Sequence, residues 1–211
     1  PPGYENVTGW HNDGVMYMRN TDGGNSQQFT MSLTKPLVDT WGWSLAYTWT
    51  NASEVSPLTS SRAISNWNNK ATFDPNEDVA ATSNYEIRDR ILGSLSFRKA
   101  FFGDYNTIFS VVYEGRSGRP HSWRFRNDMN GDGYVNDLLY IPSGPGDVLF
   151  TGGAEMEAAF YDWLGRTPEL MSYAGGATPR NGFRNPWVNT FDIRVSQELP
   201  GFMEGQKSEL W

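Results

Sequence analysis

The chain has 211 residues with a formal net charge of −7 and no cysteine, and nine tryptophans contribute to an aromatic fraction of 15%. The acidic charge argues against a nucleic-acid partner, which requires basic patches, and the lack of cysteine excludes disulfides and thiolate-bound metals. No apolar run reaches the roughly 18 residues of a transmembrane helix. Abundant aromatic residues and a hydrophobic fraction of only 38% favour a thin wall with one apolar side over a large buried core.

Neither end of the chain has the features of a natural terminus. The sequence begins Pro1-Pro2-Gly3, without a Met or the apolar core of a signal peptide, and it stops at Glu209-Leu210-Trp211, in what looks like the opening of a strand. We therefore expect the chain to be part of a longer protein.

The segment 41–50 carries the clearest periodic pattern. Side chains of a strand alternate between its two faces, so the odd positions share one face and the even positions share the other. Aromatic residues stand at both ends of the odd face and Leu45 lies in its middle, which is typical of a membrane-crossing strand with two aromatic girdles. The odd positions are Trp41, Trp43, Leu45, Tyr47 and Trp49, and the even positions are Gly42, Ser44, Ala46, Thr48 and Thr50.

The same alternation recurs in four further segments. The even faces of three of these segments carry charges of both signs, which a hydrated lumen tolerates and the core of a β-sandwich does not. Asp89 on the apolar parity, and Ile108 and Val112 on the polar parity, depart from the pattern. The strands expected from it are 28–35, 41–50, 85–98, 105–116 and 187–199, with the start of another at 207–211.

The connections between these strands alternate sharply in length. Three are short turns, whereas 51–84 and 117–186 are long. Outer-membrane barrels alternate short periplasmic turns with long extracellular loops, so we expect these two segments to be extracellular loops. The second contains an expected amphipathic helix over Ala154–Leu164, with Met156, Phe160, Trp163 and Leu164 available for packing. Because a closed membrane barrel needs at least about eight strands, further strands would come from sequence outside this chain.

An alternative interpretation is a secreted, soluble β-sandwich that binds a glycan or protein ligand in a calcium-dependent manner. Its surface tryptophans would stack on sugar rings. Detergent dependence separates the two hypotheses, because an exposed face of Trp41, Trp43 and Trp49 should aggregate in plain buffer.

Three groups of motifs in the sequence are similar to those of a known protein family. They are Glu114–Pro120 (EGRSGRP), then Asp128–Pro142 (DMNGDGYVNDLLYIP), and last Arg180-Asn181 with Asn185–Asn189 (NPWVN) and Gln197–Pro200 (QELP). In this order and spacing they resemble the C-terminal barrel region of Oar-like TonB-dependent receptors. The resemblance covers most of the chain from about Phe29 onward.

The resemblance implies antiparallel transmembrane β-barrel strands that form part of a 22-stranded plugged barrel in the outer membrane of a Gram-negative bacterium. Such receptors are active transporters that take up or translocate a substrate, and the inner-membrane TonB complex drives them through the plug domain. This sequence contains neither the plug nor a TonB box. The implied partners are outer-membrane lipid and lipopolysaccharide, TonB through the plug, other envelope proteins and a substrate that the sequence does not identify.

The segment 128–137 also matches a calcium-binding loop. Ca²⁺ takes six to eight oxygen ligands, and Gly133 permits the sharp turn in the middle of such a loop. The usual Glu at the twelfth position is replaced by Leu139, so another carboxylate would complete the site. The alternative is a metal-free turn rich in Asx and Gly residues. The expected ligands of a structural Ca²⁺ are Asp128, Asn130, Asp132, Asn136 and Asp137, with the carbonyl of Tyr134.

We predict no enzymatic activity and no catalytic residue. His11 and His121 are the only histidines, and no nucleophile-elbow motif accompanies them. Glu155 and Glu157 are expected to be solvated charges on a helix. Six arginines near the loop bases could bind lipopolysaccharide or an acidic substrate, although we favour ion pairs with acidic residues. These are Arg116, Arg119, Arg124, Arg126, Arg180 and Arg184.

Overall fold

Long antiparallel strands dominate the chain, and a computed structural model describes residues 18–203 and 205–211. His11 lies outside the described residues. The elements, in chain order, are β1 (Asn25–Lys35), β2 (Trp41–Glu54), α1 (Ala63–Asn69), β3 (Ala81–Thr82), β4 (Asp89–Phe102), β5 (Tyr105–Arg116), β6 (Pro120–His121), β7 (Tyr140–Ile141), α2 (Gly153–Gly165), the 3-10 helix η1 (Pro168–Tyr173), β8 (Gly176–Ala177), β9 (Phe183–Arg184), β10 (Val188–Pro200) and β11 (Lys207–Leu210).

The chain divides into two units. We call the first the sheet unit; it comprises Ser26–Ala52, Thr82–His121 and Phe183–Trp211. We call the second the loop unit; it comprises residues 18–25, Ser53–Ala81 and Ser122–Gly182.

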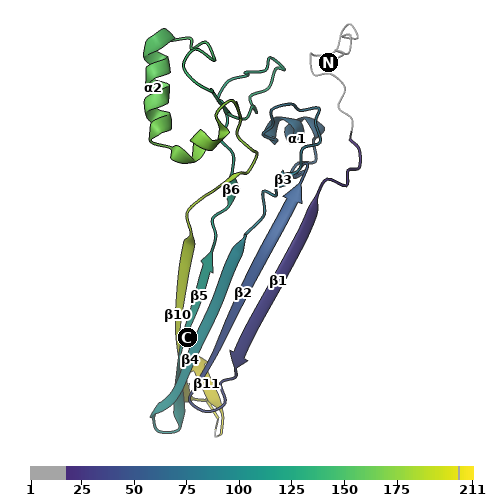
Figure 1. Cartoon of the computed structure of the whole chain (residues 1–211). Coiled ribbons are helices and arrows are strands. Elements are labelled where there is room, and N and C mark those ends of the chain that lie inside the picture. Colours follow the sequence, from purple (N-terminus) through teal and green to yellow (C-terminus); the bar gives the residue numbers. More distant parts are fainter. Residues whose placement is uncertain (1–17, 204) are drawn as a thin grey trace. The chain divides into compact units, whose positions relative to one another are not determined.

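The main sheet has seven strands in the order β1-β2-β4-β5-β10-β11, with the short β3 also paired to β2. The pairs β2–β4, β4–β5, β5–β10 and β10–β11 are antiparallel, and the long strands lie side by side in Figure 1. This confirms the all-β, antiparallel fold class. Within the described residues the sheet is open, with β1 at one edge and β11 at the other.

The strands lie where the alternation of the sequence predicts them, but some bounds differ. β2 continues to Glu54 and not only to residue 50, so it includes the start of the predicted loop 51–84, and β4 continues to Phe102 and not only to residue 98. β5 has the expected bounds, and β4 and β5 are joined by only Gly103 and Asp104, where Gly103 takes a φ of +62° that favours glycine. However, the expected strand start at Tyr85 is wrong, because β4 begins at Asp89. The chain turns just before it, where the Glu86 amide donates to the Ser83 carbonyl at 3.1 Å.

The two units differ in where they bury apolar side chains. Within the described residues, the buried side chains of the sheet unit are polar: Ser83, Glu86, Thr107, Ser117 and Ser196. The sheet unit therefore has no apolar core of its own in this part of the chain. Every buried hydrophobic residue that the structure describes belongs to the loop unit, namely Val55, Ala71, Leu138, Leu139, Ile141, Leu164 and Leu170.

The segment around Leu138–Ile141 lies at the centre of the loop unit. The Leu139 amide donates to the Trp123 carbonyl at 3.0 Å on one side, and the Leu139 carbonyl accepts from the Thr178 amide at 2.8 Å. The Leu138 amide donates to the Thr72 carbonyl at 3.0 Å, and β7 pairs with β8. Two long connections, which are far apart in sequence, thus meet in one small core.

Helix α2 lies where the sequence predicts an amphipathic helix. Leu164 is fully buried, and the Phe160 and Trp163 rings lie 5.5 Å apart, with Trp123 packed edge-on against Trp163. Met156 does not pack as expected, since it is 54% exposed. None of the helices in the described residues is long and apolar enough to cross a membrane.

A substitution in the core of the loop unit tests whether this core stabilises the unit. Leu164→Ala should lower the free energy of local opening of the loop unit by about 2–5 kcal/mol, because it leaves a cavity in a packed core. Met156→Ala on the same helix removes an exposed side chain, so it should change the free energy of local opening far less. Hydrogen exchange of the loop-unit amides measures both, and an equal effect of the two substitutions would contradict this core assignment.

Candidate functional site

One face of the main sheet is a continuous apolar surface, which we call the apolar band. Residues directly opposite each other on paired strands share a face, and the register aligns Trp43 with Leu95, Leu95 with Val111, and Val111 with Ile193. The rows above and below repeat this arrangement. The band comprises Trp41, Trp43, Leu45 and Tyr47 of β2, Ile91, Leu95 and Phe97 of β4, Phe109, Val111 and Tyr113 of β5, and Phe191, Ile193 and Val195 of β10.

The edge strand β1 extends the band. The hydroxyls of Thr30 and Thr48 lie 3.1 Å apart, which places these even positions of β1 and β2 on a common face. Phe29, Met31 and Leu33 therefore point to the opposite side, with the odd residues of β2. All three are more than half exposed.

Within the sheet unit, no second layer of described residues packs on the band. Leu45 is 48% exposed and Ile193 is 76% exposed, although both lie in the interior of long strands. A soluble sheet buries such a face against a second layer. Here the two other sheets of the described residues have only two strands each.

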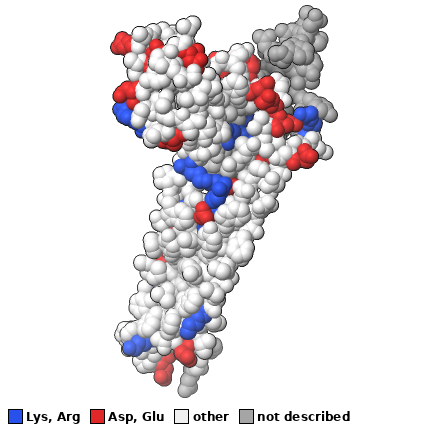
Figure 2. All heavy atoms as spheres, viewed as in Figure 1, with Lys and Arg blue, Asp and Glu red and all other residues white. Residues whose placement is uncertain are grey.

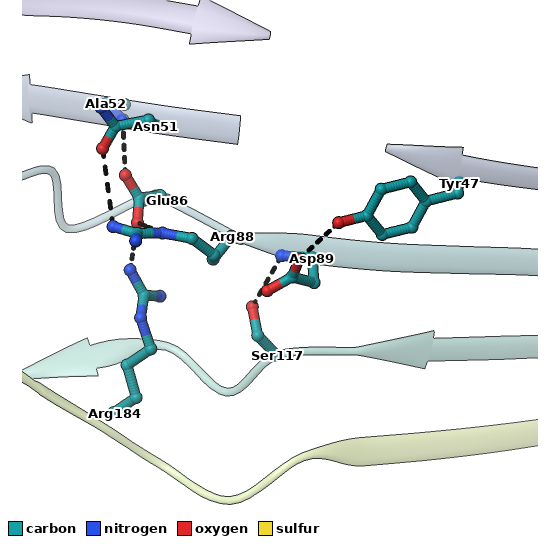
Figure 3. Close-up of polar contacts among 8 residues, drawn as sticks. All are labelled: Tyr47, Asn51, Ala52, Glu86, Arg88, Asp89, Ser117 and Arg184. Atoms are coloured by element: carbon teal, nitrogen blue, oxygen red, sulfur yellow. Dashed lines mark hydrogen bonds and ion pairs between the residues drawn. The ribbon is translucent and has the colours of Figure 1, made fainter. Parts of the chain in front are cut away.

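The end of the band near the start of β4 carries aromatic side chains with satisfied polar tips. The Tyr47 hydroxyl donates to Asp89 Oδ1 at 2.7 Å, and the Asp89 amide donates to the Ser117 hydroxyl oxygen at 3.1 Å (Figure 3). Asp89, which departs from the sequence pattern, thus lies at the boundary of the band and not within it.

Two further aromatic rings lie at the same end of the band, one on β5 and one directly before β10. The Tyr113 hydroxyl and the Trp187 indole both donate to Asn189 Oδ1, at 2.8 and 3.0 Å. Gly115 permits this arrangement, because a Cβ there would collide with the Tyr113 hydroxyl and crowd the Trp187 ring. Rings with one apolar side and one hydrogen-bonded tip suit an interface between an apolar and an aqueous phase.

Lysine side chains border the opposite end of the band. The Lys35 ammonium lies 4.4 Å from the centre of the Trp41 ring, and the Lys207 ammonium lies 5.6 Å from that of Tyr105. Trp41 and Trp49 are eight residues apart on one strand, about 27 Å at 3.3–3.4 Å per residue. At a strand tilt of about 35–45° this length projects to roughly 19–22 Å, somewhat less than the roughly 25 Å apolar band of outer-membrane barrels.

The other face of the sheet is polar. Serine hydroxyls pair across strands, Ser44 with Ser94 at 2.6 Å and Ser96 with Ser110 at 2.9 Å, and Arg90 donates to Glu114 at 2.8 Å. On the side seen in Figure 2, the middle of the long strands is almost free of charged side chains, which gather towards the strand ends. The sheet therefore has one apolar face and one mainly polar face, on which Leu92, Ile108 and Val112 are apolar exceptions.

Comparison with protein-family models, with curated proteins and with solved structures gives no match to this chain. Any functional assignment of this chain therefore rests on the geometry of the sheet unit and of the loop unit.

A buried carboxylate, which the sequence alone does not single out, lies just before β4. The Glu86 side chain is fully buried, and it accepts hydrogen bonds from the Ala52 amide at 2.5 Å, from Arg88 Nε at 3.1 Å and from Arg184 (Figure 3). Burial by itself would raise the pKa of Glu86, but the Ala52 amide and the two guanidinium groups outweigh it and lower that pKa below its ordinary value. The network connects β2 and β9 to the segment just before β4.

Three of the six arginines near the loop bases have side-chain partners within the protein. Arg184 pairs with Glu86, and Arg116 lies 4.0 Å from Glu114. Arg180 is buried and donates to the carbonyls of Glu54 and Val79. Arg116 and Arg184 thus pair with acidic residues, as we favoured, whereas Arg180 binds backbone carbonyls.

Other sequence candidates fall in ordinary structural positions. His121 packs its ring against Phe183, 5.9 Å between centres. Glu155 is in the first turn of α2, and Glu157 accepts a hydrogen bond from the Gly146 amide at 2.7 Å.

The Asp/Asn-rich loop forms part of the loop unit. Asp128, Asn130 and Asp132 bond mostly to the loop's own backbone, whereas Asn136 and Asp137 are buried beside the core. Within the described residues, no group of three or more His, Cys, Asp or Glu side chains is arranged so that it could hold a metal ion.

The Glu86 network predicts a specific pH dependence. Glu86→Gln should lower the free energy of unfolding by about 1.5–3 kcal/mol, because charge-assisted hydrogen bonds are lost. A carboxyl group with a lowered folded-state pKa stabilises the fold above its unfolded pKa of about 4.3, and this contribution disappears as the pH falls through the folded value. The difference between wild type and variant should therefore be complete above about pH 5 and shrink in more acidic solution.

Denaturant unfolding at several pH values measures this difference. Glu155→Gln, on the exposed surface of α2, is the matched control and should change stability by less than about 0.5 kcal/mol. A Glu86→Gln deficit that does not vary between pH 7 and pH 3 would show that the ionised carboxylate is not the stabilising group.

Proposed function

We propose that this chain forms part of the barrel wall of an outer-membrane TonB-dependent active transporter of the Oar-like kind. The observation that carries the proposal is the apolar band: a meander of long strands with one uncovered apolar face. Lipid acyl chains are the occupant that suits a face of this thickness, bordered by hydrogen-bonded aromatic rings and lysines. A complete barrel of roughly 22 strands would continue from the free edges of β1 and β11.

The connections between the strands support the same proposal. Those between β1 and β2, between β4 and β5, and between β10 and β11 are short, whereas those from β2 to β4 and from β5 to β10 supply most of the loop unit. Long loops at one end and tight turns at the other are characteristic of outer-membrane barrels, where the long loops face the exterior. The loop unit would then meet lipopolysaccharide and substrate, and the TonB complex would act through a plug domain encoded elsewhere.

The soluble β-sandwich alternative lacks a specific observation in its favour. Such a protein needs a second sheet over the apolar face. Within the described residues, no such layer is present.

A pair of neighbouring substitutions on β2 tests the proposal. Leu45 lies in the middle of the apolar band, and Ala46 points to the opposite face. In the full-length protein, Leu45→Arg should lower the free energy of folding into phospholipid vesicles by roughly 2–4 kcal/mol, the cost of an arginine at the midplane of the bilayer. Ala46→Arg should cost less than about 1 kcal/mol, because its side chain enters the hydrated interior.

Urea titration of the protein in vesicles measures both variants. Equal tolerance of the two arginines, together with a protein that stays monodisperse without detergent, would exclude a lipid-facing band and favour a soluble module.

A further inference from the structure

The loop 128–137 folds around its own first carboxylate. Asp128 accepts hydrogen bonds from the amides of Gly131, Asp132 and Gly133, at 2.7, 3.2 and 2.8 Å. Asp132 accepts from the Tyr134 amide at 2.9 Å. Gly131 and Gly133 take φ angles of +78° and +90°, which strongly favour glycine. One tight turn thus carries several side-chain carboxylate and amide oxygens.

A second, independent feature is the buried carboxylate of Asp137, which is only 2% exposed. Its Oδ2 accepts from the Met129 amide at 2.7 Å, so the group faces the start of the loop beside Asp128. Its Oδ1 is buried and has no hydrogen-bond partner within the described residues. None of the ion pairs in that part of the chain includes Asp137.

The neighbouring Asn136 shows the same deficit. It is completely buried, its Nδ2 donates to the Trp67 carbonyl at 3.1 Å, and its Oδ1 has no partner in the described part of the chain. A buried acceptor that makes no hydrogen bond destabilises the fold, and a buried charge does so more strongly unless a cation or hydrogen-bond donors compensate it. Two such oxygens on adjacent residues, next to a loop of carboxylates, point to a cation.

We propose that this loop binds Ca²⁺, with Asp137 Oδ1 as a buried, fixed ligand. Asp128, Asn130, Asp132 and the Tyr134 carbonyl supply further oxygens, and Asn136 Oδ1 is available beside them. Since three carboxylates do not already converge in the described residues, Asp128 and Asp132 would turn from backbone amides toward the ion. Ca²⁺ suits this mixture of carboxylate, amide and carbonyl oxygens, because its coordination is large and irregular, whereas Mg²⁺ requires a small octahedral shell.

The position of the loop gives the ion a structural consequence. The Asn136 carbonyl accepts from the Thr72 amide at 3.0 Å, and the Asp137 carbonyl accepts from the Phe125 amide at 3.0 Å. Thr72 and Asp137 come from the two long connections of the loop unit. Calcium at Asp137 would therefore stabilise both connections together. This inference does not depend on the proposed membrane function.

Terbium luminescence and calorimetry test the proposal on the full-length protein in detergent micelles. Tb³⁺ should bind and be sensitised by nearby Tyr134 or Trp67, added Ca²⁺ should displace it, and Ca²⁺ titrated into chelator-treated protein should bind with saturation. Asp137→Asn and Asp132→Asn should each weaken Ca²⁺ binding roughly tenfold or more. Asp162→Asn, which changes an exposed α2 carboxylate paired with Arg166 at 2.5 Å, should bind as wild type does.

The variants keep the proposed calcium site testable even where one of them does not fold. If Asp137→Asn fails to fold, Asp132→Asn still tests the site, because its carboxylate lies on the loop and outside the core. Absence of saturable Ca²⁺ binding to the wild type, or an equal loss in Asp162→Asn, would overturn the site. Displacement of Tb³⁺ by Mg²⁺ as readily as by Ca²⁺ would overturn the assignment to calcium.

Discussion

The main physical constraint on the sheet is its continuous apolar face. Its long strands pair in a register that aligns apolar residues with apolar residues, as in the row from Trp43 through Leu95 and Val111 to Ile193. In a soluble protein such a face would be buried, since removal of apolar area from water is the main driving force for folding. Among the described residues the sheet unit buries no hydrophobic side chain, whereas the loop unit buries a conventional core around Ile141 and Leu164. The two units thus bury apolar side chains in different ways, and in the proposed transporter the acyl chains of the bilayer would cover the apolar face of the sheet.

Polar groups along the sheet are arranged according to the same division. At one end of the band, Tyr47 and Tyr113 direct their hydroxyls to Asp89 and Asn189, so their rings can remain apolar while their tips are satisfied. The fully buried Glu86 lies three residues before Asp89, beyond the band, where two arginines and a backbone amide compensate its charge. A charge of this kind inside the band would require the same compensation in hydrocarbon.

The sequence predicts the parts of the fold that repeat and misses those that depend on a single distant partner. Period-two alternation identifies β2 and β5 well, because every second side chain meets the same environment. It fails at Tyr85, where the chain turns before β4, and it carries no signal for two-residue strands such as β7 and β8. Glu86 escapes detection because its burial requires Arg184, 98 residues away. The Asp128–Asp137 motif is visible in the sequence, but the burial of Asp137 emerges only when the segment packs beside Thr72.

Collision measurements on nitroxide labels along β10 test the central claim, that the odd-numbered side of this sheet contacts hydrocarbon. Single labels at positions 190 to 195 of the full-length protein in lipid bilayers would report access to oxygen, which concentrates in acyl chains, and to a water-soluble nickel chelate. We expect a two-residue period, with oxygen access high at Phe191, Ile193 and Val195 and chelate access high at the residues between them. Equal chelate access at Ile193 and Arg194, or low access to both reagents at all three odd positions, would contradict it.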